Sequence, residues 1–427
     1  MNIRHLRRAS LMLATFCCAS QTVHAAFIED GTGSLELRNF YFDRDFHGDT
    51  ATQSRRSEWA QGFMLKLQSG YTEGVVGFGL DATGMLGIKL DSSADRSGTG
   101  LLPRGSDRRA VDDYGKAVAT LKAKLSETEL RVGGLSPLLP LLAANYSRLF
   151  PQWFNGAQLV SKDLEHFTVT ALEVDATKLR DSTDYEDLTA MAQQGAYSAT
   201  VSSDRLYYAG VDYQPLDNLT LSLHSSRLED LFQRDFVGFK FKTGLGPGDI
   251  FTEWRWFNAR EQGRALLGEV DNRTLSTNVG YSVQGHTFSG GYQKVRGDTA
   301  YAYVGGTDTY LFSEQQVSTF ALANERAWML RYDYNFAALG FPGLTFNVRY
   351  VKGDQVDPQR IASVKGRALQ ARGGEGREWE RTTDISYVVQ SGLLKHVSLR
   401  WRNASMRSNF ADGADENRVI LGYTVEF

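Results

Sequence analysis

The chain ends on the ten residues RVILGYTVEF, Arg418 to Phe427, in which two kinds of side chain alternate. One face carries Val419, Leu421, Tyr423, Val425 and Phe427, and the other carries Arg418, Ile420, Gly422, Thr424 and Glu426. Period-two alternation predicts a β-strand. An apolar face that ends in aromatic residues fits a strand with lipid on one side and water on the other. The segment therefore predicts a membrane strand that reaches the last residue.

The same alternation recurs upstream. Its apolar faces are Val397, Leu399 and Trp401; Ile385, Tyr387 and Val389; Leu344, Phe346, Val348 and Tyr350; and Trp328, Leu330, Tyr332, Tyr334 and Phe336. Short connections (Ser391 to Lys395, Ala337 to Pro342) alternate with long ones (Lys352 to Arg381, Gly297 to Ala327). Short periplasmic turns and long extracellular loops are the plan of an outer-membrane barrel. We therefore predict an all-β, transmembrane antiparallel β-barrel with little helix, in which residues 137–150 form an inserted loop.

A soluble β-sandwich is the main alternative, because its strands also have one apolar and one polar face. Two features favour the barrel. The apolar faces end in Tyr, Phe and Trp, as an interfacial aromatic girdle requires, and the opposite faces carry charged residues such as Arg349 and Asp333 in mid-strand. After the first thirty residues, the sequence has no apolar run of the roughly 18 residues that a spanning helix needs.

The N-terminus resembles a signal peptide, with Arg4, Arg7 and Arg8 before the apolar run Leu11 to Cys18. Cleavage after Ala25 or Ala26 would leave a signal peptide at 1–26 and a barrel at 27–427. A lipoprotein anchored at Cys17 or Cys18 is the alternative, but Phe16 is bulky for the position before a lipidated cysteine. Both cysteines of the chain lie in this segment, so the exported protein would have no disulfide.

Signals for catalysis are few. The histidines are scattered without metal-ligand spacing, and the common hydrolase and metalloprotease motifs are absent from the sequence. The formal net charge of −3 does not favour a nucleic-acid partner. We expect no cofactor and no metal. A barrel hydrolase built on His224, with Ser222 and Ser225 nearby, is kept as a rival hypothesis.

Five arginines near the C-terminus fall on the polar, lumen-facing parity of four predicted strands: Arg331, Arg349, Arg400, Arg402 and Arg418. Chain direction would put Arg331, Arg349 and Arg418 near the tops of their strands and the pair Arg400 and Arg402 between them. Together they would form a vertical basic track on one wall. A guanidinium stays charged and binds a carboxylate through two parallel hydrogen bonds. Such a row would pass an anion from site to site. The alternative is that these arginines balance lumenal acids such as Asp333 and Asp384, so general anion selectivity does not follow.

Several local motifs resemble the OprD (Occ) family of substrate-specific outer-membrane channels. They are LRNFYFDRD from Leu37, GVVGFGLD from Gly74, GLLP from Gly100, SRLFPQ from Ser147, LED from Leu228, GDT from Gly297 and LRYD from Leu330. The resemblance runs from about Phe27 to Phe427. It implies a monomeric channel of about eighteen strands, narrowed by inward-folded loops, with a basic ladder that guides carboxylate-bearing solutes.

The resemblance also implies individual residues. Arg400, Arg402 and Arg418 would belong to the ladder, to which we add Arg38, and Arg148 would be the constriction arginine on the third loop. Tyr303, Asp308 and Thr309 would form an electronegative wall opposite the arginines. Ser386 stands where a family member has a lysine, so the ladder would be one rung shorter.

The leading hypothesis is an integral outer-membrane channel for passive, selective uptake of small carboxylates, such as amino acids and organic or aromatic acids. A size-selective porin is the first rival, and an adhesion or structural barrel is another. Expected partners are these solutes, outer-membrane lipid and lipopolysaccharide, and the barrel-assembly machinery through the C-terminal strand.

Overall fold

The computed structural model describes residues 24–427, except 49, 194–195, 198–199 and 362. Its main sheet has 18 antiparallel strands. The strands are β1 (Thr32–His47), β2 (Arg55–Gln68), β3 (Gly77–Asp91), β4 (Asp113–Leu125), β5 (Thr128–Leu135), β8 (Trp153–Ser161), β9 (Phe167–Lys178), β12 (Leu206–Leu216), β13 (Leu219–Leu228), β14 (Phe232–Leu245), β15 (Gly248–Glu261), β16 (Asp271–Val283), β17 (His286–Arg296), β19 (Arg326–Asn335), β20 (Leu344–Val356), β21 (Gly376–Val388), β22 (Ser398–Ser408) and β23 (Gly413–Glu426). The predicted fold class is confirmed. Residues 1–23, most of the predicted signal peptide, lie outside the described part.

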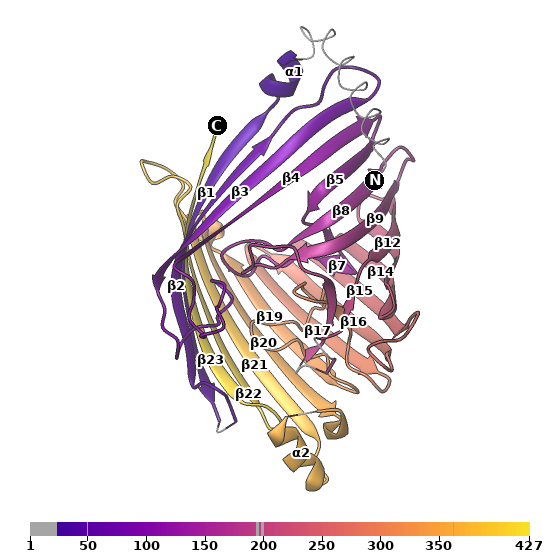
Figure 1. The fold of residues 1–427 in the computed structure, drawn as a ribbon. Helices are drawn as coiled ribbons and strands as arrows, with labels where there is room; N and C mark the ends of the chain where they lie inside the picture. Colours follow the sequence, from indigo (N-terminus) through magenta and orange to yellow (C-terminus); the bar gives the residue numbers. More distant parts are fainter. Residues whose placement is uncertain (1–23, 49, 194–195, 198–199, 362) are drawn as a thin grey trace, which may run out of the picture.

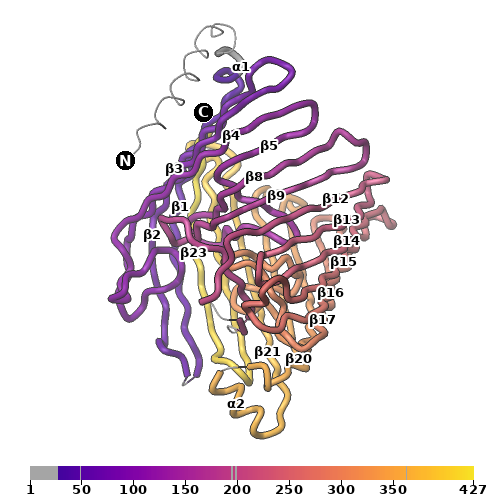
Figure 2. Tube along the Cα trace, turned by 45° about the vertical axis from the view of Figure 1, so that its right-hand side comes forward, coloured from indigo at the N-terminus to yellow at the C-terminus, as the bar shows by residue number. Residues whose placement is uncertain are grey.

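The sheet closes on itself because β1 pairs with β23 (Figure 2). Phe427 takes part in this closure. Its carbonyl accepts a hydrogen bond from Gly33 N–H at 2.7 Å, and its own N–H donates to the Gly33 carbonyl at 2.9 Å. The last residue of the chain is therefore hydrogen-bonded to the first strand. Closure removes the free edges that a membrane sheet cannot leave unpaired.

The predicted outer faces are confirmed. Leu330, Trp328 and Leu399 are 70%, 53% and 50% exposed, whereas Ala327 on β19 and Ala404 on β22, which have the opposite parity, are buried. Turns such as 217–218 and 246–247 lie at one end of the barrel, with helix α1 (His24–Glu29) and the C-terminus, and the long loops lie at the other (Figure 1). Among the described residues, no helix has both the length and the apolar character needed to cross a membrane.

One predicted boundary is wrong. Lys352 to Arg381 is not a single loop, because β20 continues to Val356 and β21 begins at Gly376. The cause is cross-strand pairing beyond the apolar belt, where Lys352 pairs with Trp379. The remaining loop 8 (357–375) contains the 3-10 helix η3 (Pro358–Arg360) and helix α2 (Val364–Ala371).

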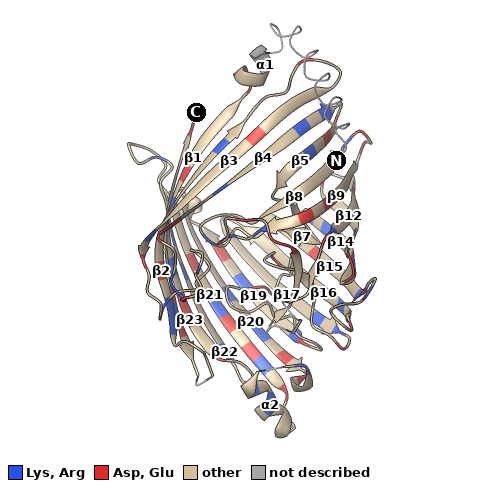
Figure 3. Ribbon diagram, in the orientation of Figure 1, with Lys and Arg blue, Asp and Glu red and all other residues tan. Residues whose placement is uncertain are grey.

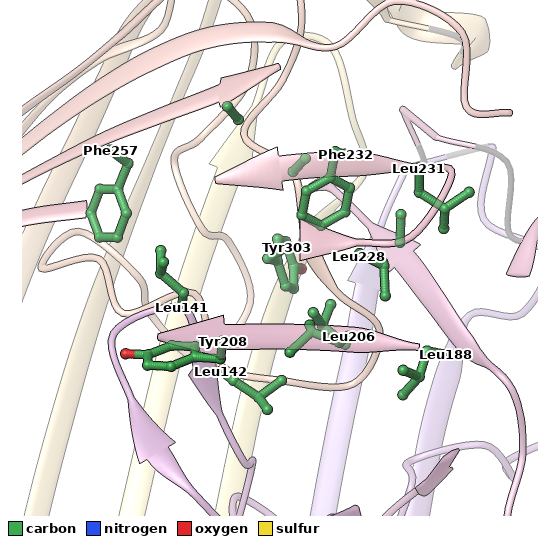
Figure 4. Packing of buried hydrophobic residues seen from close by; sticks show 14 of the residues in the cluster. Leu141, Leu142, Leu188, Leu206, Tyr208, Leu228, Leu231, Phe232, Phe257 and Tyr303 are labelled. Atoms are coloured by element: carbon green, nitrogen blue, oxygen red, sulfur yellow. The ribbon is translucent and has the colours of Figure 1, made fainter. Parts of the chain in front are cut away.

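Several extracellular loops fold into the barrel. Loop 3 (136–152) contains the short hairpin β6 (Leu138–Leu139) and β7 (Leu142–Ala143), so the predicted inserted loop is confirmed. Loop 7 (297–325) contains β18 (Tyr303–Val304), which pairs with β10 (Leu188–Met191) of loop 4 (179–205); β10 also pairs with β11 (Ser202–Ser203). Figure 4 shows Leu141 and Leu142 of loop 3 and Tyr303 of loop 7 among wall residues of β12 to β15. These contacts fix the loops inside the pore.

Candidate functional site

Four of the predicted ladder arginines line one cavity on the inner wall. The cavity has a volume of about 430 Å³, and its lining includes Arg331, Arg349, Arg400 and Arg402 together with Asp333 and Asp384. These residues come from β19 to β22, where Figure 3 shows Lys, Arg, Asp and Glu interspersed along the wall. Four cations face two carboxylates, so the cavity has an excess of positive charge.

Each aspartate of this cavity binds an arginine. Arg331 donates to both oxygens of Asp333, at 2.7 and 2.6 Å. Asp384 is shared between Arg400, whose Nε lies 2.9 Å from it, and Arg402. The Arg402 Nε lies 2.9 Å from Asp384 Oδ2 but has no hydrogen bond of acceptable geometry. The predicted pairing with lumenal acids is therefore present, and it leaves donor capacity on Arg402.

The predicted ladder arginines include two cross-strand pairs. Arg331 is the register partner of Arg349, and Arg402 is the register partner of Arg418. Arg402 therefore lies beside Arg418 on the neighbouring strand. Because strands tilt around a barrel, register does not give relative height, and the vertical order of the arginines stays a prediction. The basic wall consists of side-by-side pairs.

Arg418 has a different environment from the cavity arginines. Its side chain is 2% exposed and its Nε donates to Glu416, which is fully buried. Arg44 of β1 donates to the other oxygen of Glu416 at 2.6 Å, and the Arg418 guanidinium lies 5.1 Å from the ring centroid of Phe42. One carboxylate thus holds two arginines across the β1–β23 closure.

Arg148 lies on loop 3, as the family resemblance implied. Its Nε donates to the Thr99 carbonyl at 2.8 Å and its Nη1 to Ser147, so it also ties loop 3 to loop 2 (92–112). Burial lowers the pKa of Arg148 well below its ordinary value, and the nearby Arg418 and Arg180 lower it further. An arginine stays protonated in a protein. The shift therefore marks first a buried positive charge, and second a surrounding set of arginines that the nearby Glu416 only partly balances.

Arg38 lies beside loop 3. It donates to the Arg148 carbonyl at 2.9 Å, forms an ion pair with Glu36 at 2.7 Å and lies 4.1 Å from the ring centroid of Tyr146. The Tyr146 hydroxyl also donates to Glu36. Arg38 therefore supports the base of loop 3.

Asp308 joins loop 7 to loop 3. Its backbone N–H donates to the Ala143 carbonyl at 2.9 Å, and its carboxylate accepts from the Asn145 amide. Arg180 of loop 4 donates to Asn145 Oδ1 at 2.7 Å. Three loops consequently meet at Asn145. We call this junction of Asn145, Asp308, Arg148 and Arg180 the narrow zone, because the predicted constriction residues Arg148 and Asp308 lie in it. Burial raises the pKa of Asp308 and Arg180 opposes this effect.

The other two predicted wall residues are turned away from this contact. Thr309 is 1% exposed and bonds Glu314 of its own loop through its N–H and its hydroxyl. Tyr303 is 5% exposed and lines a second cavity of about 590 Å³ between loops 4 and 7, together with Arg180 and Asp181. Of the three predicted wall residues, only Asp308 contacts Asn145 at the narrow zone.

Comparison with known proteins places this geometry in a family. The family model "outer membrane porin, OprD family" matches residues 25–427. The chain belongs to the OprD family of outer-membrane porins. It is 35% identical over 422 residues to Porin D of Pseudomonas aeruginosa, covering 95% of this chain and 93% of that protein. OprD-family porins are channels, and the 18-stranded barrel agrees with an integral outer-membrane protein.

Two solved structures from this family resemble the barrel closely. The crystal structure of Pseudomonas aeruginosa OccK9 (OpdG) is 42% identical, with a TM-score of 0.88, and the match covers 94% of this chain and all of that one. The structure of Pseudomonas aeruginosa OpdK with vanillate is 36% identical, with a TM-score of 0.86 and the same coverage.

In this OprD-family chain, the sequence prediction missed Arg180 and Asn145 of the narrow zone and Arg44, which binds Glu416. Arg44 could have been predicted, because it has the same inward parity as Phe42 in β1. Arg180 and Asn145 lie in loops, where no periodicity gives side-chain direction. The one sequence feature that points to Asn145 is its position two residues before the motif SRLFPQ, which begins at Ser147.

His224, the residue on which the hydrolase rival depended, lies in the barrel wall and is 5% exposed. One ring nitrogen contacts the Tyr208 hydroxyl at 2.8 Å and the other lies 3.2 Å from Asp212. Ser222 donates to Asp212 and Ser225 to Asp235. Neither serine is therefore paired with the histidine as an activated nucleophile requires.

Glu314 of loop 7 predicts a pH dependence in this porin. Burial, and then the nearby Asp308 carboxyl, raise the pKa of Glu314 to about 7. The carboxyl is therefore neutral below this pH and negative above it. We expect the preference for chloride over potassium to fall between pH 6 and pH 8, and Glu314→Gln to remove most of that change. The measurement is the reversal potential of purified channels in a KCl gradient.

Asp298→Asn is the matched control, because Asp298 is an acid of the same loop that is 63% exposed. It should keep the wild-type pH dependence. An unchanged pH dependence in Glu314→Gln would mean that another group is responsible.

Proposed function

We propose that this OprD-family porin is a channel for passive uptake of small carboxylate-bearing solutes, guided by lumenal arginines. The observation that carries the proposal is the cavity of about 430 Å³ that four arginines and two aspartates line. The similar OpdK structure was solved with vanillate, which is a carboxylate. A solute carboxylate in this cavity would meet donors that the lumenal acids only partly occupy.

The route begins between loops 4 and 7. An incoming anion would pass Arg180 in the upper cavity and then the narrow zone, where the unbalanced charge of Arg148 attracts it and Asp308 limits the positive field. Below this zone it would meet Arg402 and Arg400. The preorganised guanidinium forks favour carboxylates over spherical anions, because two parallel hydrogen bonds add geometric specificity.

Transfer would proceed by exchange of partners. Asp384 and Asp333 hold the arginines in place when no solute is present, and a solute carboxylate competes with them. Because each bond to a solute replaces an existing one, binding is weak enough for release, which a channel requires. We also expect a monomer, as the family resemblance implies.

Arg400→Gln, Arg402→Gln tests the proposal. Loss of charge-assisted hydrogen bonds, each contributing about 1.5–3 kcal/mol, should lower the benzoate-to-chloride permeability ratio roughly tenfold. The ratio is obtained from reversal potentials with benzoate on one side of a planar bilayer and chloride on the other. Arg381→Gln is the control, because Arg381 is an arginine of β21 that contacts Asn403 and Ser405 on the outer face.

A second variant separates guidance from simple charge balance. Arg331→Gln, Asp333→Asn removes a bidentate pair without changing the net charge of the cavity. If Arg331 guides carboxylates, benzoate permeability falls severalfold while chloride permeability changes little. Equal permeability of benzoate and a similar-sized neutral solute in the wild-type channel would instead indicate a size-selective porin.

A further inference from the structure

The outer wall of β16 to β21 carries a repeated pattern at its extracellular end. On each of five strands, an outward apolar or aromatic residue is followed two positions farther out by a cation: Leu275 and Arg273, Tyr292 and Lys294, Trp328 and Arg326, Tyr350 and Lys352, Trp379 and Arg377. Residues two apart in a strand share a face. The cations therefore lie directly beyond the aromatic girdle, on the outside of the barrel.

Two pairs of neighbouring rings make up the girdle in this sector. The rings of Tyr292 and Trp328 have centroids 4.7 Å apart, and those of Tyr350 and Trp379 are 5.9 Å apart. Aromatic girdles mark the boundary between lipid chains and headgroups. The six cations Arg273, Lys294, Arg296, Arg326, Lys352 and Arg377, which we call the basic collar, thus lie at headgroup level. Figure 3 shows Lys and Arg at the extracellular ends of strands in this region.

Like charges face each other within the basic collar. Arg273 is the direct register partner of Arg296, and Lys294 is the partner of Arg326. Among the described residues, neither Arg273 nor Arg296 has an ion-pair or hydrogen-bond partner for its guanidinium, and both are exposed. Like charges directly opposite each other destabilise a sheet. An anion bound between them would remove this cost.

The protein's own acids neutralise only part of the collar. Arg326 binds Asp354 at 2.9 Å and Arg377 lies 3.7 Å from Glu375, but Lys294 contacts only the neutral oxygens of Asn324 and Gln355. Strands outside the collar differ. On β2 and β22 the outward Arg55 and Arg407 each pair with an aspartate, Asp43 and Asp415.

We propose that the basic collar binds the phosphate groups of a glycolipid in the outer leaflet, with Arg273 and Arg296 holding one phosphate and Lys294 and Arg326 contacting a second. Lipid, and not free phosphate, is the source, because the collar adjoins the girdle on the lipid-facing wall. Arginine forks match phosphate oxygens bidentately and lysine adds a mobile point charge. Phosphate bridging would also hold β16 to β19 together next to the base of loop 7.

The test uses purified, full-length channel in detergent, titrated with diphosphoryl lipid A and followed by native mass spectrometry. Arg273→Gln, Arg296→Gln should weaken lipid A binding about tenfold or more, given roughly 1 kcal/mol for each cation at a charged lipid surface. Monophosphoryl lipid A should bind the wild type more weakly than the diphosphoryl form. Inorganic phosphate at millimolar concentration should not displace lipid A.

The matched control is Arg55→Gln, Arg407→Gln, which removes two outward arginines that aspartates already neutralise and should leave lipid A affinity unchanged. Without lipid A, Arg296→Gln should not lower the thermal midpoint, because it relieves repulsion. The proposed site would be overturned if the double variant Arg273→Gln, Arg296→Gln bound lipid A as tightly as the wild type does. It would also be overturned if the control variant lost as much affinity as this double variant. Displacement by inorganic phosphate alone would overturn the lipid assignment.

Discussion

Glu380→Ala is expected to convert the channel into a wide, weakly selective pore. Glu380 is fully buried in β21 and anchors loop 7. Its carboxylate accepts hydrogen bonds from three consecutive backbone N–H groups, those of Gln316 at 2.9 Å, Val317 at 3.1 Å and Ser318 at 2.8 Å. Alanine would leave the buried N–H of Ser318 unpaired, at a cost of about 1–3 kcal/mol, and would also remove the acceptor of the two partly buried N–H groups. Loop 7 should then leave its place against the wall.

The measurement is single-channel conductance in KCl, which should rise severalfold because loop 7 no longer meets loop 3 at Asp308. The discrimination between benzoate and chloride should fall toward that of free diffusion. Glu375→Ala, at an exposed acid just before the same strand, should retain wild-type conductance. Wild-type conductance in Glu380→Ala would show that other contacts hold loop 7.

Glu416→Gln is expected to have the second large effect, on stability and on charge selectivity together. Arg44 and Arg418 share this fully buried carboxylate across the closing strand pair. Removing one partner of a buried charge network costs about 3–5 kcal/mol, because charges remain uncompensated. The thermal midpoint of the barrel should fall. The surviving channels should become more anion-selective, since the arginines remain.

The checks are the temperature at which the barrel unfolds in a gel-shift assay and the reversal potential in a KCl gradient. Asp415→Asn is the control, because Asp415 is the adjacent acid and pairs with Arg407 on the outside. It should leave selectivity unchanged. Lower stability in Glu416→Gln without a change in selectivity would place Glu416 outside the region that filters ions.

The strands, the barrel and the direction of the ladder side chains could be predicted from the sequence, because a period of two relates every residue of a strand to one face. Arg331, Arg349, Arg400 and Arg402 follow from parity alone. The pairing of Arg402 with Arg418 does not, because it depends on register between strands. The ion pair of Arg44 with Glu416 joins the first and last strands, 372 positions apart, and emerges only when the sheet closes.

Loop residues were much less predictable. The family resemblance placed Arg148 and Asp308 near the narrow zone, but local geometry decides what each does. Thr309 turns inward to bond Glu314, and Tyr303 lies at the upper cavity. Asn145 joins three loops through contacts with distant residues that no local pattern reveals. Side-chain direction in such segments follows from tertiary packing and not from propensity.

The most direct test of carboxylate guidance is a crystal structure of the channel with p-bromobenzoate, in which the anomalous signal locates the bromine. We predict a site in the cavity lined by Arg331, Arg349, Arg400 and Arg402, with the carboxylate displacing Asp384 from at least one guanidinium. Arg400→Gln, Arg402→Gln should lose this signal. Bromine bound only elsewhere, or a site that persists in the variant, would contradict guidance by the arginines.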